Sequence, residues 1–137
     1  MNYKNNLEAV NERIHKALER SGRKSDDITL IAVTKNVEVD VIKQAVSYGL
    51  TDLGENRVQE LLSKYDEIDN VRWHMIGRLQ SNKVKYIVDK VAMIHSLDSL
   101  SLAKEINKYG EKIEKVVPVL VQVNAAKEET KAGLPYE

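Results

Sequence analysis

The chain has 137 residues, of which 42% are hydrophobic and 31% are charged, as is usual for a globular domain with one core. Its 21 Lys and Arg residues balance its 21 Asp and Glu residues, so no net field attracts nucleic acid or an anionic membrane. The absence of Cys excludes disulfides, thiolate catalysis and cysteine-bound zinc, and fits a reducing cytoplasm. We expect one cytoplasmic domain over residues 1–137, without a membrane span.

The first predicted element is a helix, because apolar residues from Leu7 to Leu18 recur at helical spacing before Gly22. The next segment, residues 28–34, is a strand with hardly any polar alternation, which is typical of a parallel sheet covered on both faces. Strand and helix patterns then alternate to the end of the chain. Strands are predicted over residues 28–34, 50–56, 71–77, 92–98 and 116–124, and the helices between them over residues 42–49, 58–65, 84–91 and 102–110.

This alternation predicts an α/β protein built from right-handed βαβ units around a parallel sheet. Five strands fit either a doubly wound open sheet or the first five strands of a (β/α)8 barrel, and periodicity does not choose between them. A complete barrel needs at least about 200 residues, more than the chain has.

In both architectures, ligands bind at the carboxyl ends of the strands. Polar residues gather at the predicted ends, namely Lys35, Asn36, Glu55, Asn56, His74, His95, Ser96, Asp98, Gln122 and Asn124, with Lys127, Glu128, Glu129 and Lys131 soon after. Each has an ordinary structural explanation: Lys35 as a solvated loop residue, Asn56 as a helix cap, and His74 as a core histidine bonded to a backbone carbonyl. Their coincidence at one edge favours a ligand site.

Lys35 has the most specific chemistry of this set. Partial burial lowers the pKa of a lysine, and the free amine can then form a Schiff base with an aldehyde. The sequence lacks the phosphate-binding loops GxxxxGK[ST] and GxGxxG, the zinc motif HExxH and the nucleophile motif GxSxG. Its three histidines also lack the spacing of metal ligands.

Five segments together resemble the pyridoxal phosphate (PLP) homeostasis protein family, which is related to the N-terminal barrel of alanine racemase. They are "IAVTK" (31–35), "GENRVQE" (54–60), "WHMIGRLQSNK" (73–83), "IHSLDS" (94–99) and "VLVQVN" (119–124). The resemblance runs from about residue 5 to the end of the chain, and the eleven-residue string is its most specific part.

The resemblance implies a (β/α)8-type barrel that stores or delivers PLP to apoenzymes without turnover of its own. Carried over by position, Lys35 is the Schiff-base lysine, with Asn56 and His74 at neighbouring strand ends and Ser96 as a looser candidate. Lys131 matches a lysine after the fifth strand and is a candidate for a second, weaker PLP site.

About five of the eight barrel strands are accounted for in this sequence, so we expect a C-terminally incomplete domain. The phosphate-binding loops of such barrels usually follow the last two strands, and we therefore expect reduced PLP affinity. Five strands also leave two open sheet edges, one of them the apolar segment 116–124. A homodimer paired through these edges is a further expectation.

Two enzyme alternatives and one inactive alternative remain open. An amino-acid racemase needs a second acid/base group on the opposite face of the cofactor, and no tyrosine falls at a predicted strand end. A cofactor-free Schiff-base aldolase would use Lys35 with a base such as Glu55. The last alternative is a structural fragment without activity.

Overall fold

The fold is a single parallel five-stranded sheet with its strands in sequence order. The computed structural model describes residues 2–136. Its strands are β1 (Ala32–Val33), β2 (Asp52–Glu55), β3 (Arg72–Met75), β4 (Val91–Leu97) and β5 (Val119–Val121). Each strand pairs with the next in parallel, in the order β1-β2-β3-β4-β5.

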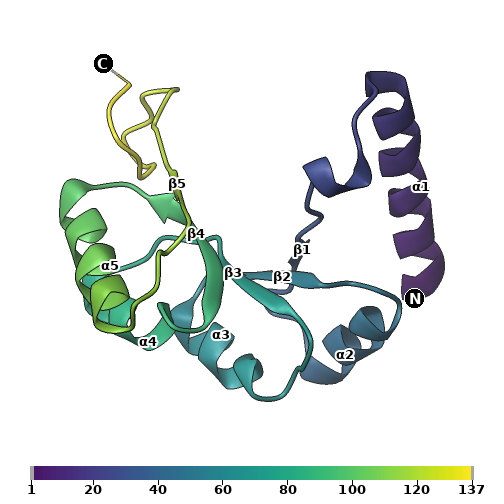
Figure 1. The fold of residues 1–137 in the computed structure, drawn as a ribbon, viewed down its shortest axis with the longest axis horizontal. Coiled ribbons are helices and arrows are strands. Elements are labelled where there is room, and N and C mark those ends of the chain that lie inside the picture. Colours follow the sequence, from purple (N-terminus) through teal and green to yellow (C-terminus); the bar gives the residue numbers. More distant parts are fainter. Residues whose placement is uncertain (1, 137) are drawn as a thin grey trace.

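The helices lie along one face of this curved sheet. The α-helices are α1 (Tyr3–Ser21), α2 (Val39–Ser47), α3 (Val58–Tyr65), α4 (Val84–Ile87) and α5 (Leu100–Lys112), and the 3-10 turns are η1 (Ser25–Asp27) and η2 (Ser81–Lys83). Helices α2 to α5 follow the convex side of the sheet, whereas α1 stands apart near the N-terminus (Figure 1).

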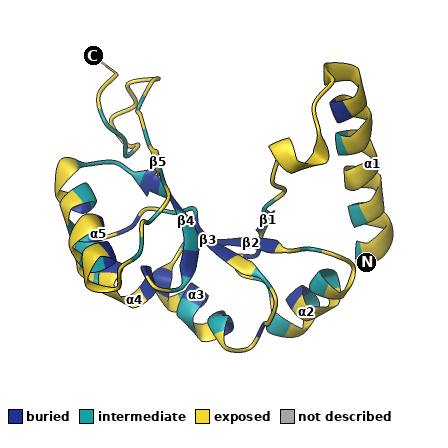
Figure 2. Ribbon diagram, viewed as in Figure 1, coloured by how far each residue is buried: buried dark blue, intermediate teal, exposed yellow. Residues whose placement is uncertain are grey.

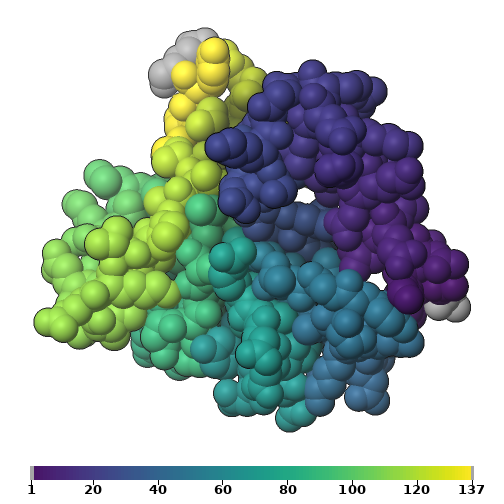
Figure 3. Space-filling view, turned by 45° about the vertical axis from the view of Figure 1, so that its right-hand side comes forward, coloured from purple at the N-terminus to yellow at the C-terminus, as the bar shows by residue number. Residues whose placement is uncertain are grey.

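Strand order and helix placement decide between the two predicted architectures. A doubly wound sheet reverses its strand order and carries helices on both faces, while this sheet does neither. The space-filling view shows the chain progressing in colour order around the molecule, from purple α1 to green α5 (Figure 3). The arrangement is that of a (β/α)8-type barrel with five strands, as predicted.

The first strand is shorter than predicted. Residues 28–34 were expected to be extended, but only Ala32 and Val33 form β1. They pair with Leu53 and Gly54 of β2, and the Thr34 N–H donates one further hydrogen bond to the Gly54 carbonyl. Strand β1 lies at the edge of the sheet, next to β2 alone. The residues before Ala32 form no strand pairing with β2, and they are largely exposed.

The hydrophobic core lies between the sheet and helices α2 to α5. Figure 2 shows buried residues concentrated on the strands and on the sides of these helices that face the sheet. Alternation along the strands turns one set of side chains toward the helices. This set includes Leu53, Trp73, Met75 and Ile94, which are all at most 2% exposed.

The opposite, concave face is covered less well than the apolar strand pattern predicted. Val33 of β1 is 54% exposed and Leu120 of β5 is 49% exposed. Gly54, between them in the sheet order, leaves room for the Ile31 and Ile76 side chains, which approach the position of its missing Cβ within 3.0–3.1 Å. The concave face is therefore exposed at the two edge strands, whereas Asp52 and His74 on the central strands are buried.

Helix α1 ends as the sequence predicts. Gly22 adopts a left-handed conformation with φ of +68°, and its N–H donates to carbonyls in the last turn. Among residues 2–136, no helix combines the length and the hydropathy of a membrane span.

The one-sided core gives a direct stability prediction. Ile94→Ala removes a side chain with no exposed surface, and we expect it to lower the free energy of unfolding by about 2–5 kcal/mol. Leu100→Ala is the control, because Leu100 is 70% exposed, and its effect should stay within about 0.5 kcal/mol. Urea titration followed by circular dichroism measures both. Equal effects would contradict the assignment of the core to the helix side of β4.

Candidate functional site at the carboxyl edge of the sheet

Lys35 lies directly after β1, in the turn that leads to α2. Its neighbour Thr34 is buried toward the helices, so strand alternation places Lys35 with Val33 on the concave face. The Lys35 side chain is exposed, and among residues 2–136 its amine has no hydrogen-bond or ion-pair partner. The amine is therefore accessible to a small molecule on that face.

A buried network holds the residues on both sides of Lys35. The Lys64 ammonium, on α3, donates to the Thr34 carbonyl at 2.8 Å, to Glu55 Oε1 at 2.7 Å and to Glu60 Oε1 at 2.8 Å. The Thr34 hydroxyl also donates to Glu55 Oε1, at 2.7 Å. Beyond Lys35, the Asn36 N–H donates to Glu60 Oε1 at 2.5 Å. The turn is thus fixed at residues 34 and 36.

The same network gives Lys64 a chemical role that differs from that of Lys35. Burial alone would lower the pKa of Lys64, but hydrogen bonds and the charges of Glu55 and Glu60 outweigh burial and raise it. An ammonium has three N–H donors, and all three of Lys64 are engaged. Lys64 is therefore held protonated and cannot act as an amine nucleophile, whereas Lys35 is unengaged.

Asn56, the second predicted site residue, follows β2 beside this turn. The predicted capping role is wrong: helix α3 begins at Val58, its cap residue is Arg57, and no side chain caps it. Among the described residues, the half-buried Asn56 amide has no hydrogen-bond partner. Gly77 packs so closely on the Asn56 backbone that a Cβ at position 77 would overlap it. A free amide group is thus held at the edge of the sheet.

His74, the third predicted residue, lies lower on the same face in a chain of side-chain hydrogen bonds. His74 Nε2 is 2.8 Å from Asp52 Oδ1, and His74 Nδ1 is 2.9 Å from His95 Nε2. Because a carboxylate only accepts, Nε2 of His74 carries a proton and donates it to Asp52, while Nδ1 of His74 shares a single proton with Nε2 of His95. The expected bond to a backbone carbonyl is wrong, since both ring nitrogens bond to side chains.

The charges in this chain are set by Asp52. Arg72 donates to both Asp52 oxygens, at 2.9 and 2.8 Å. Burial would raise the pKa of Asp52, but hydrogen bonds from Arg72, His74 and Thr51 lower it to about 2. Burial and the nearby His74 lower the pKa of His95. The result is an ionised carboxylate at the end of a chain of two hydrogen-bonded imidazoles.

Ser96 and Lys131 lie away from Lys35. Ser96, on β4, is 1% exposed, and its hydroxyl has no hydrogen-bond partner among the described residues. Lys131 is exposed in the segment after β5 and lines a separate hollow of about 380 Å³ with Asn124 and Glu128. Strands β1 and β5 form opposite edges of the sheet, so the structure does not bring Lys131 to the Lys35 turn.

A basic hollow opens at the same carboxyl edge. It has a volume of about 350 Å³ and includes Asn56, Arg57, Arg78 and Lys83 in its wall. No carboxylate lines it, although Asp98 lies 4.0 Å from the Arg78 guanidinium. Three cations around a small volume favour an anionic ligand.

Sequence reasoning did not find the Lys64 network or the Arg72–Asp52 pair. The spacing of Glu60 and Lys64 indicates a pair four residues apart on a helix, a pattern that is usually solvent-exposed. Glu55 was considered as an aldolase base, but it is fully buried and bonded to Thr34 and Lys64 on the helix side. It is therefore not available to a substrate on the Lys35 face.

The tyrosines offer no second acid/base group near Lys35. Those that the structure describes lie in helices, directly after a helix, or near the C-terminus, at positions 3, 48, 65, 86, 109 and 136. Within residues 2–136, no cluster of His, Asp or Glu forms a candidate metal site.

Fold and site together define a (β/α)8-type half-barrel with an accessible lysine at the carboxyl edge. No protein-family model matches the chain. The chain is 48% identical to the pyridoxal phosphate homeostasis protein of Aquifex aeolicus over 139 aligned residues, covering 100% of this chain and 61% of that protein. It is 34% identical to the protein of the same name from Escherichia coli K12, covering 94% and 57% of the two chains.

Solved structures agree with these relatives. PipY of Synechococcus elongatus with PLP bound superposes with a TM-score of 0.73 and 34% identity, covering 86% of this chain and 55% of PipY. An unknown protein from Bifidobacterium adolescentis superposes with a TM-score of 0.80 and 30% sequence identity, covering 96% of this chain and 58% of that protein. The resemblance to the PLP homeostasis proteins is confirmed, and the chain spans about three fifths of the length of these curated relatives.

The Asp52 site predicts how stability depends on pH. The pKa of Asp52 is about 2 in the folded protein against an ordinary 3.8, so its stabilisation is complete above pH 4 and is lost as the pH falls through 2. The loss amounts to about 2 kcal/mol by pH 2. The Asp52→Asn variant has no titrating group at this position. Between pH 5 and pH 2, the free energy of unfolding of the wild type should therefore fall by about 2 kcal/mol relative to that of the variant. A constant difference would contradict the assignment.

Proposed function

We propose that residues 1–137 act as a single PLP-binding domain that holds the cofactor as a Schiff base on Lys35. The observation that carries the proposal is the free Lys35 amine, presented beside the unpartnered Asn56 amide at the carboxyl edge. PLP binding by PipY, whose structure superposes on this chain, supports it.

The residues present fit the chemistry of PLP. Lys35 would hold PLP through the cofactor's aldehyde group as a Schiff base, a condensation that releases water. The Asn56 amide provides a donor and an acceptor for the ring substituents. Arg57, Arg78 and Lys83 supply positive charge for the phosphate at the same edge. These are surface cations, so we still expect weaker PLP binding than in the longer relatives.

We propose a role in cytoplasmic PLP homeostasis, in which the domain stores PLP or delivers it to apoenzymes without catalysing a reaction. The assignment as non-catalytic is supported by the surroundings of Lys35. Both nitrogens of His74 are already bonded, and Glu55 is buried. A racemase or an aldolase would need a free acid/base group at the Lys35 amine, and the described residues there supply none.

The remaining predicted ligands have weaker support. His74 adds a polar side chain to the concave face. The Ser96 hydroxyl has no hydrogen-bond partner among the described residues, but Ser96 is buried, so this hydroxyl could bind a ligand only if β4 opened. Lys131, with its own hollow after β5, is proposed as a secondary PLP site that is independent of Lys35.

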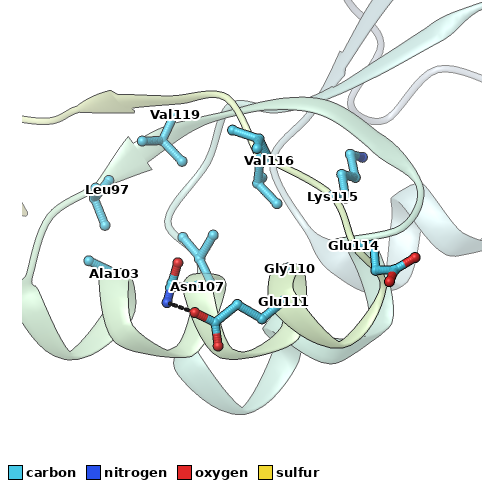
Figure 4. A pocket seen from close by; sticks show the side chains of 11 residues that line it. Leu97, Ala103, Asn107, Gly110, Glu111, Glu114, Lys115, Val116 and Val119 are labelled. Atoms are coloured by element: carbon cyan, nitrogen blue, oxygen red, sulfur yellow. Dashed lines mark hydrogen bonds between the residues drawn. The ribbon is translucent and has the colours of Figure 1, made fainter.

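We also propose that the open edges of the sheet pair two copies of the chain. An apolar hollow of about 410 Å³ lies between α5 and β5, with Leu97, Ala103, Val116 and Val119 around it (Figure 4). Val116 is 93% exposed. An exposed apolar edge strand is a template for pairing with another chain, and pairing there would cover this hollow.

The Schiff base is tested by adding PLP, reducing with borohydride and mapping the modified lysine by mass spectrometry. We expect visible absorbance from the bound cofactor and a label at Lys35 that Lys35→Met abolishes. Lys43→Met, which removes an exposed lysine of α2, is the matched control and should keep the label. Absence of label at Lys35 at every PLP concentration would refute the proposal, and racemisation of alanine or serine would refute the non-catalytic role.

The proposed dimer is tested by sedimentation equilibrium. We expect a concentration-dependent dimer that Val121→Lys disrupts, because Val121 lies on the exposed edge strand and lysine opposes edge pairing. Lys43→Glu on α2, away from both edges, serves as the control. A folded monomer at high concentration would contradict the pairing of edges.

A further inference from the structure

We propose that Lys64, Glu55 and Glu60 form a clamp that positions the Lys35 turn for reaction with an aldehyde ligand. The inference rests on the proposed function, and it assigns positioning roles to three residues that do not touch the ligand. We call these residues the Lys64 clamp.

The clamp contacts the backbone on both sides of Lys35. On one side, Lys64 and Val37 N–H both donate to the Thr34 carbonyl, at 2.8 and 3.1 Å. On the other side, Glu60 accepts from the Asn36 N–H. Lys64 joins the two sides because it donates to Glu55 and Glu60 simultaneously. The Lys35 side chain lies between these two anchored residues and is exposed.

The turn needs this support because the preceding strand, β1, fixes its backbone with few hydrogen bonds. Strand β1 has two residues and a single neighbour. Asn36 then takes a left-handed conformation with φ of +60°, which is uncommon outside glycine. A hydrogen bond to a charged acceptor is stronger than one between neutral groups, so the Glu60 carboxylate is well suited to hold the Asn36 N–H in this conformation.

Two residues of the Lys64 clamp, Glu60 and Lys64, lie on α3, and the clamp is largely buried. The Lys64 and Glu55 side chains are 7% and 0% exposed, while Glu60 is 21% exposed. Lys64 and Glu60 sit one turn apart on α3, so the side chains that bond to Thr34 and Asn36 come from the same helix. Removing Lys64 would leave the Glu55 carboxylate buried without its cation, which is strongly destabilising. Glu60 is therefore the better position for a test.

The decisive comparison is Glu60→Ala against Glu60→Gln. The alanine variant removes the acceptor of the Asn36 N–H, while glutamine retains an oxygen at that place. In Glu60→Ala we expect amide exchange at Asn36 to accelerate about tenfold or more, from the loss of one charge-assisted hydrogen bond. Schiff-base formation with PLP should slow by a similar factor, and Glu60→Gln should recover part of both losses, because its oxygen still accepts a hydrogen bond but carries no charge.

Leu62→Ala is the matched control for a general loss of stability. Leu62 lies on the same helix and packs against the core, and its apolar side chain makes no hydrogen bond to the turn. It should lower the unfolding midpoint at least as much as Glu60→Ala, yet leave Asn36 exchange under native conditions and the reaction rate of Lys35 unchanged.

The outcomes separate the clamp from the proposed function. If the wild type forms a Schiff base at Lys35 but Glu60→Ala reacts at the wild-type rate, the clamp is refuted and the function stands. If the wild type does not react with PLP, the function is refuted, and Asn36 exchange still tests the clamp. Equal effects of Leu62→Ala and Glu60→Ala on both readouts would also overturn the positioning role.

Discussion

The buried Lys64 ammonium is the interaction on which the candidate site depends. It joins two glutamates and the Thr34 carbonyl between α3 and the first two strands. Burying these charges is costly unless each is paired and hydrogen-bonded. The three donors of Lys64 are all bonded, and Glu55 accepts through Oε1, while its Oε2 is buried without a hydrogen-bond partner among the described residues. The pairing fixes the backbone around Lys35 and keeps Lys64 itself unreactive. One lysine at this edge is thus structural and the other is available for chemistry.

The division of the sheet into two faces explains where ligand chemistry can occur. Leu53, Trp73, Met75 and Ile94 fill the helix side of β2, β3 and β4 with apolar core. The concave face instead carries the polar chain from Arg72 to His95 and, at its upper edge, Lys35 and Asn56. The chain spans about three fifths of its curated relatives, and its concave face and two edge strands remain open.

Much of the fold could be predicted from the sequence, because alternating strand and helix patterns and apolar periodicity reflect local physics. Lys35 and Asn56 were found because they follow strand patterns directly. The doubly wound alternative could not be excluded, since periodicity carries no information on strand order. The Lys64 clamp was missed because its partners are up to 30 residues apart, and a helical Glu–Lys pair is usually exposed. The short β1 was missed because its apolar residues resemble a buried strand, although the strand is an edge with one neighbour.

The central claim is that PLP binds at the Lys35 edge, and its location is tested most directly by titrating PLP into the isotope-labelled protein and mapping amide shifts. The account predicts that the largest changes occur at Lys35, Asn36, Asn56 and Arg57, with smaller changes near Lys131 at higher concentration. Changes confined to the segment after β5, or to the hollow beside α5, would contradict it.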